Sequence, residues 1–151
     1  MSKFATAFGE KYQENKLSII TRTFVLGNHT FRVRIPSVAE LEAIYKYAEA
    51  PDEALIEKEY QTLTQFLKEL EKDNDVVLEG RSMREAAKNK VVLQYRITEY
   101  FKLLIPDTGA SLENLEYSDI EAEFPFAVQM EFFEAINEVI APDYKQARGK
   151  S

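Results

Sequence analysis

The chain has 151 residues, 45% of them hydrophobic, which suits a single domain with one core. It contains no Cys, and this excludes a disulfide framework, thiolate metal sites and a cysteine nucleophile. The net charge of −7 arises mainly in residues 103–144, which carry ten acidic residues and no Lys or Arg. Because such a segment repels nucleic acid and anionic membranes, we expect neither as a partner.

The N-terminus lacks the apolar stretch of a signal peptide, and no segment approaches the roughly 18 apolar residues of a membrane span. We therefore expect a cytoplasmic protein. Within residues 1–17, Phe4, Phe8 and Tyr12 recur every four residues and would share one side of a helix. We expect residues 1–17 to be a flexible arm, either frayed or ordered on a partner or a second copy. Residues 145–151 are expected to form a basic tail.

Residues 18–35 predict a β-hairpin. Apolar and polar side chains alternate on both sides of Gly27-Asn28, and a Gly-Asn pair is typical of a tight hairpin turn. Pro36 ends the second strand. Because a lone two-stranded hairpin is only marginally stable in water, we expect it to pack on the rest of the chain.

Helical segments follow the hairpin, with Ser-x-x-Glu capping boxes predicted to begin at Ser37, Ser82 and Ser118. The buried side of the first helix is expected to consist of Val38, Leu41, Ile44, Tyr45 and Ala48. The apolar periodicity predicts helices at about 38–50, 56–70, 82–104 and 124–140, with a short helical turn before Pro125. The expected fold class is therefore mainly α (α+β), with an N-terminal β-hairpin followed by a bundle of about four helices. Residues 18–144 are expected to form this single domain.

No motif predicts catalysis, a cofactor or a metal. The only His, His29, lies at the expected hairpin turn. Residues 73–75 resemble the start of a calcium loop, but Leu78 occupies the position that requires Gly. Residues 149–151 resemble the end of a phosphate-binding loop, but Tyr144 occupies the place of its first Gly. An enzyme that uses only carboxylates stays open as an alternative, because the chain has 26 acidic residues.

The last predicted helix has an apolar arc of roughly 220°, whereas one contact with a core needs roughly 100°. Either its neighbours bury it on all sides, or one side packs on the core and the other binds a partner. In the second case we expect Val128→Asp and Phe132→Asp to remove binding and to leave the fold intact. The candidate partner-binding residues are Phe124, Phe126, Val128, Met130, Phe132, Phe133, Ile136 and Val139.

Residues 23–41, TFVLGNHTFRVRIPSVAEL, resemble the opening of bacteriophage tail assembly chaperones. In those proteins an apolar-Gly-x-x-Phe hairpin leads into a helix capped by a polar residue and Glu, and a compact acidic helical body follows. The resemblance implies a non-enzymatic protein of the bacterial host cytoplasm that is absent from the mature virion. It implies binding to the tape measure protein, which is kept soluble, and a part in recruiting tail tube protein.

Alternatives from other classes stay open. One is another small phage structural or completion protein. Another is an acidic inhibitor of a host nucleic-acid-binding protein, because the acidic segment could imitate the charge of nucleic acid. Self-association through the N-terminal arm or the last helix is compatible with each of them.

Overall fold

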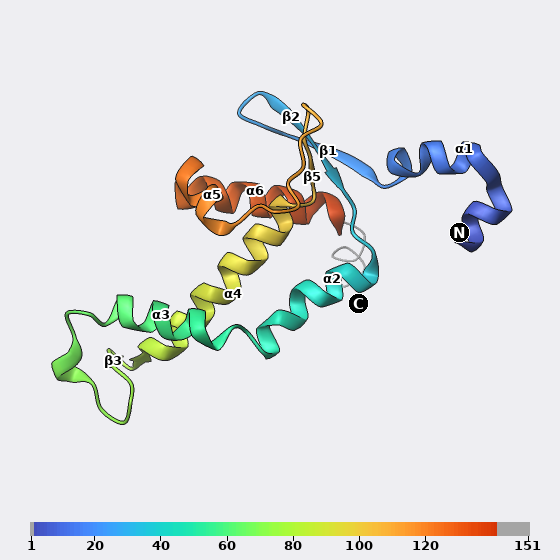
Figure 1. Ribbon diagram of the computed structural model, residues 1–151. Coiled ribbons are helices and arrows are strands. Elements are labelled where there is room, and N and C mark those ends of the chain that lie inside the picture. The colour runs from blue at the N-terminus through green and yellow to red at the C-terminus, as the bar shows by residue number, and fades with distance from the viewer. Residues whose placement is uncertain (1, 142–151) are drawn as a thin grey trace, which may run out of the picture.

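The computed structural model describes residues 2–141 (Figure 1). The fold is mixed α+β and 60% helical, with six helices and a three-stranded antiparallel sheet, so the expected class is confirmed and the expected helix number of about four is too low. The helices are α1 (Lys3–Ile19), α2 (Val38–Lys46), α3 (Glu53–Leu63), α4 (Met83–Phe101), α5 (Tyr117–Glu123) and α6 (Phe126–Ile140). The strands are β1 (Thr21–Leu26), β2 (His29–Arg34), β3 (Val77–Leu78), β4 (Arg81–Ser82) and β5 (Leu104–Ile105), and short 3₁₀ turns occupy Tyr47–Glu49 and Lys68–Leu70.

The predicted hairpin is confirmed as β1 and β2, which pair antiparallel. Gly27 and Asn28 form the turn with φ of 58° and 65°. Two consecutive left-handed residues make the turn whose twist matches that of the strands, which explains the Gly-Asn pair. The strand β5 extends the sheet in the order β1-β2-β5. Residues 18 and 19, expected in the first strand, belong instead to the end of α1.

The long helix α4 runs from the region of α3 to that of α6 and the sheet (Figure 1). It contributes residues to two separate hydrophobic cores. Its N-terminal half packs against α3 in the smaller core, which contains Tyr60, Val76 and Val91. Its C-terminal end packs against α6 and the sheet in the larger core, which contains Val33 and Phe101. The body is therefore elongated along α4, although the length of the chain suggested a single core.

Helix α3 ends earlier than the periodicity predicts. The sequence predicts one helix to Leu70, but α3 stops at Leu63, and Thr64 is fully buried with its hydroxyl donating to the carbonyl of Tyr60 at 2.7 Å. The chain then reverses, and the Tyr60 hydroxyl donates to Glu71 at 2.6 Å. A straight helix would carry residue 71 away from Tyr60, so closing this contact requires the break. As a result, Phe66 is 89% exposed.

The capping predictions are partly right. Ser37 and Glu40 form a complete capping box at α2, and the Ser82 hydroxyl caps α4 by accepting the amide of Glu85. The third prediction is wrong, because the residue before the first turn of α5 is Glu116 and not Ser118. Its capping box pairs Glu116 with Asp119. The Asp119 carboxylate accepts the backbone amide of Glu116 at 2.9 Å, and the amide of Asp119 donates to the backbone carbonyl of Glu116.

Helix α1 extends away from the body and is kinked at Gly9, which has a φ of 76° (Figure 1). The rings of Phe4 and Phe8 stack on its surface with centroids 6.3 Å apart. The proposed division at residues 17 and 144 stays a prediction, and the expected basic tail at 145–151 lies outside the described residues. Among the helices of residues 2–141, none has the length and apolar character needed to cross a bilayer.

Candidate partner-binding surfaces

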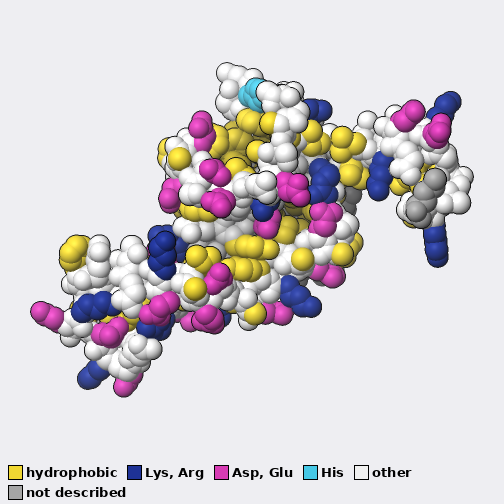
Figure 2. All heavy atoms as spheres, viewed as in Figure 1, with side chains coloured by type: hydrophobic (Ala, Val, Ile, Leu, Met, Phe, Trp, Pro, Cys, Tyr) yellow, Lys and Arg dark blue, Asp and Glu magenta, His cyan; other side chains and the backbone are white. Residues whose placement is uncertain are grey.

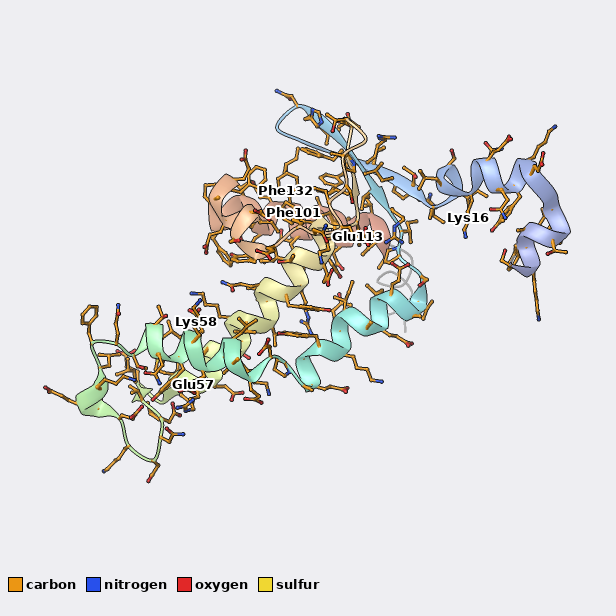
Figure 3. The ribbon with its side chains drawn as sticks, in the orientation of Figure 1. Lys16, Glu57, Lys58, Phe101, Glu113 and Phe132 are labelled. Atoms are coloured by element: carbon orange, nitrogen blue, oxygen red, sulfur yellow. The ribbon has the colours of Figure 1, made fainter. Side chains whose placement is uncertain are left out.

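One face of α6 lies in the larger core. Gln129, Phe132, Ile136 and Ile140 are buried, and their spacing of three and four residues places them in one stripe. Phe132 lies at the centre of an aromatic cluster, next to Phe101 at the end of α4 (Figure 3). Its ring centroid lies 5.0 Å from those of Phe101 and Phe124 and 5.1 Å from that of Phe31.

This burial corrects part of the predicted binding surface. Phe132 and Ile136 are 3% and 0% exposed, so neither offers a surface to a partner in this structure. We therefore expect Phe132→Asp to disrupt the fold, contrary to the expectation from sequence. The structure leaves Phe126 54% exposed. The five other candidates are half-buried: Phe124, Val128, Met130, Phe133 and Val139.

A hydrogen-bonded network fixes α2, α4 and α6 to one another. The hydroxyls of Tyr45 and Tyr100 lie 2.5 Å apart, and Tyr100 donates to Asn137 Oδ1 at 3.1 Å. Burial is the main cause that raises the pKa of Tyr100 above its ordinary value, and the bond with Tyr45 adds to it. Both effects keep the hydroxyl protonated, so it can donate to Asn137. The network sets the spacing of α2 and α6, which together form the first candidate surface.

The α2/α6 groove is an apolar channel of about 1300 Å³ beside this network. Val38 is 76% exposed and Tyr45 40% exposed, so these two do not belong to the buried side of α2 as expected, whereas Ile44 is 7% exposed and does. Glu42, Lys46 and Glu49 carry the charges along the groove. Its apolar lining consists of Ile35, Pro36, Val38, Leu41, Ile140 and Ala141.

The sequence contains a signal for this groove, although the same signal also fits a side of the helix that faces the core. The apolar positions of residues 38–48 suggest one buried side, but α2 presents Val38 to solvent and buries Ile44. Periodicity identifies an apolar face and does not reveal whether the chain supplies enough neighbours to cover it. The uncovered part of that face forms one wall of the groove.

The α5/α6 pocket is a second, smaller hollow of about 570 Å³ between α4 and the start of α6. Leu93, Phe124 and Phe126 supply its apolar surface, and Glu121 lies at its edge. Lys90, also at the edge, is neutralised by Glu59 at 2.6 Å. The pocket therefore presents aromatic rings within an acidic part of the surface, and Figure 2 shows acidic side chains gathered over α5.

The buried side chain of Gln129 supports the wall of the α5/α6 pocket. The Tyr117 hydroxyl donates to Gln129 Oε1 at 2.6 Å, and Gln129 Nε2 donates to the carbonyl of Phe124 at 3.0 Å. These bonds satisfy a polar group that is 2% exposed and hold the turn between α5 and α6. This turn positions Phe124 and Phe126 at the pocket.

The polar residues with candidate chemistry have structural partners. His29 Nε2 lies 3.0 Å from Asp107 Oδ2 at the hairpin turn, and both side chains are 56% exposed. In the segment that resembles a calcium loop, Asp75 accepts hydrogen bonds from the Ser82 hydroxyl at 2.5 Å and the Arg84 amide at 3.1 Å. The Ser82 hydrogen bond is the main cause that lowers the pKa of Asp75. Within residues 2–141, no three His, Asp or Glu side chains are grouped so as to hold a metal ion.

Comparisons with known proteins do not assign the chain to a family. No family model matches it, and neither the curated proteins nor the solved structures contain a match.

Proposed function

We propose that this protein is a non-enzymatic tail assembly chaperone of a phage or prophage. In this role it binds the tape measure protein in the host cytoplasm, keeps that protein soluble and helps to recruit tail tube subunits. The observation that carries the proposal is the α2/α6 groove, an apolar channel between two helices on the surface of an acidic protein. The resemblance of residues 23–41 to such chaperones supports it independently of the groove.

The shape of the α2/α6 groove suits a helical ligand. Helices pack when the side-chain ridges of one enter the grooves of another, at interaxial distances of about 8–10 Å. An amphipathic helix would place its apolar residues, spaced by three and four, against Val38, Leu41 and Ile140. Tape measure proteins are long and helical, so they present many such segments, which aggregate when left uncovered.

Charge gives the complex a way to stay in solution. The protein carries a net charge of −7, and exposed acidic residues keep a complex with an apolar ligand from aggregating. The groove itself carries both signs, with Lys46 between Glu42 and Glu49. Charges of both signs can pair with the acidic and basic residues that flank the apolar face of an amphipathic helix.

The test is coexpression with the tape measure protein of the same phage. We expect the wild-type chain to raise the soluble fraction of the tape measure protein and to copurify with it. Val38→Asp should weaken this binding at least tenfold, because it places a charge in the apolar channel. Position 38 is the first of α2, where a negative charge favours the helix, so the fold should be retained.

Phe66→Asp is the matched control, because Phe66 is 89% exposed, lies just after the end of α3 and is not among the residues that line the groove. It should bind as the wild type does. Wild-type affinity in Val38→Asp would remove the groove from the proposal. Failure of the wild-type chain to bind the tape measure protein, together with its presence in purified virions, would favour a structural or completion protein instead.

A further inference from the structure

Helix α1 presents an uncovered aromatic surface. Phe4 and Phe8 are 62% and 64% exposed, and their rings lie 6.4 and 6.0 Å from that of Tyr12. The stack persists across the kink at Gly9, so the three rings form one continuous stripe. Exposed rings in such a row are typical of a contact surface rather than of a solvated helix.

Charge is divided unevenly along the chain. Residues 1–36 contain six basic and two acidic residues, a net charge of +4. Residues 37–151 contain thirteen basic and twenty-four acidic residues, a net charge of −11. The aromatic stripe lies in the positive part, and the α5/α6 pocket is lined by residues 117–129 of the acidic segment together with residues 89–94 of α4. Helix α1 itself has three basic and two acidic residues, a net charge of +1, and Arg32 and Arg34 of the hairpin pair with acidic residues of the body. Residues 103–141 have nine acidic residues and no Lys or Arg, so a weakly positive aromatic surface is matched by an acidic one.

The fold prevents α1 from reaching the pocket of its own chain. Only Ile20 separates α1 from β1, and the Thr21 hydroxyl donates to the carbonyl of Leu17 at 2.5 Å. Arg22 Nη1 donates to the carbonyl of Ile19 at 3.1 Å. These bonds hold the end of α1 to the sheet, and α1 and α5 lie on opposite sides of the body (Figure 1). The side chain of Lys16 likewise lies on the part of α1 that stands clear of the body (Figure 3).

We infer that the aromatic stripe of α1 docks into the α5/α6 pocket of a second copy of this chain. Phe4 and Phe8 pack against Phe124 and Phe126 there, and Lys3 and Lys11 face the acidic residues at the pocket. Aromatic pairs at such contacts add to the burial of apolar area. The arm of one copy and the pocket of the next are different surfaces, so the contact is head-to-tail. It builds a ring if the rotation closes and a filament if it does not.

The first measurement is the molar mass of the full chain by light scattering over a range of concentrations. We expect the wild type to exceed the monomer mass and the mass to increase with concentration. The arm variant Phe4→Ser/Phe8→Ser should be monomeric, as should the pocket variant Phe126→Ser/Glu121→Lys. All four side chains are exposed, so these changes should leave the circular dichroism spectrum and the unfolding midpoint close to wild type.

A mixing experiment separates this contact from other modes of association. The arm variant keeps its pocket, and the pocket variant keeps its arm, so an equimolar mixture should form a one-to-one dimer that grows no further. In the control, Phe66→Ser/Glu69→Lys takes the place of the pocket variant. Both of its changes are at exposed positions between α3 and β3. This control variant should associate by itself as the wild type does.

Three results would overturn the inference. They are a wild type that is monomeric at every concentration, an arm variant with wild-type mass, and a mixture of arm and pocket variants that stays monomeric. A pocket variant that keeps the wild-type mass would overturn it too, because it would indicate pairing between two α1 helices. None of these results depends on binding to the tape measure protein, so this test and that of the proposed function fail separately.

Discussion

The hydroxyl of Tyr100 on α4 donates to Asn137 Oδ1 on α6 at 3.1 Å and lies 2.5 Å from the hydroxyl of Tyr45 on α2. One buried phenol on α4 thus joins α2 and α6, the two helices that line the groove. The stack of Tyr100 on Phe133, with centroids 4.5 Å apart, holds the ring in place. The groove is accordingly attached to the core through polar as well as apolar contacts.

Tyr100→Phe tests this connection. The substitution keeps the ring but leaves Asn137 and Tyr45 without their partner, and we expect it to lower the free energy of unfolding by about 1–3 kcal/mol. Urea denaturation measures the change. Tyr45→Phe is the matched control and should cost less, because Tyr45 is 40% exposed and water replaces the lost bond. An equal loss of stability in the two variants would mean that the hydrogen bond from Tyr100 to Asn137 contributes little to the free energy of unfolding.

Phe132→Ala should be among the most damaging substitutions. Phe132 is 3% exposed and contacts four other aromatic rings, so removing it leaves a cavity that costs about 3–5 kcal/mol. Phe66→Ala removes the same atoms from a side chain that is 89% exposed and should change stability by less than about 0.5 kcal/mol. Thermal unfolding of both proteins makes the comparison. A small effect in Phe132→Ala would restore this residue to the list of surface candidates.

The pair of Arg34 and Glu40 predicts a dependence of stability on pH. Two hydrogen bonds from Arg34, at 3.0 and 2.8 Å, are the main cause that lowers the pKa of Glu40 to about 2, and the Ser37 amide adds to the effect. Because the folded pKa is the lower one, this contribution is present above pH 4.5 and is lost as the pH falls toward 2.

Glu40→Gln has no such titration, so the difference in unfolding free energy between it and the wild type should shrink between pH 4.5 and pH 2. The Glu40 side chain is 46% exposed, and solvent screening limits the difference at neutral pH to about 1 kcal/mol. Urea denaturation at several pH values tests this. A difference that does not vary with pH would mean that the ion pair does not form in solution.

Arg84→Lys should weaken the smaller core region. The Arg84 guanidinium lies 3.8 Å from the centre of the Tyr60 ring, donates to Glu57 at 2.6 Å and also bonds to Asn74. An ammonium group cannot stack on the ring and make these bonds together, so we expect a loss of about 1–2 kcal/mol. Limited proteolysis should then cleave residues 64–82 faster than in the wild type. Lys58→Arg, an exposed change on α3, is the control.

Local signals in the sequence predicted local structure well. Gly27-Asn28 specifies a turn through its own backbone preference, and Ser37 with Glu40 forms a capping box from atoms three residues apart. Such features depend on near neighbours along the chain. The same reasoning explains the correct placement of α4 and most of α6.

Features that depend on distant contacts were not predictable in the same way. The end of α3 at Leu63 follows from the return of the chain to Tyr60 through Glu71, which no helical periodicity encodes. The width of the apolar arc on α6 was correct evidence of burial, but Phe132 is covered in part by rings distant along the chain, Phe24 and Phe31 of the hairpin. Exposure of Val38 likewise depends on which elements lie opposite α2.

The continuity of α4 has a consequence for the order in which the protein opens. Val91 belongs to the smaller core and Ile97 to the larger, and both lie on one uninterrupted helix. Either core can lose its packing while the other still holds its half of α4. The amides between these two residues exchange with solvent deuterium only when both halves have opened, so they should be the slowest to exchange in the chain.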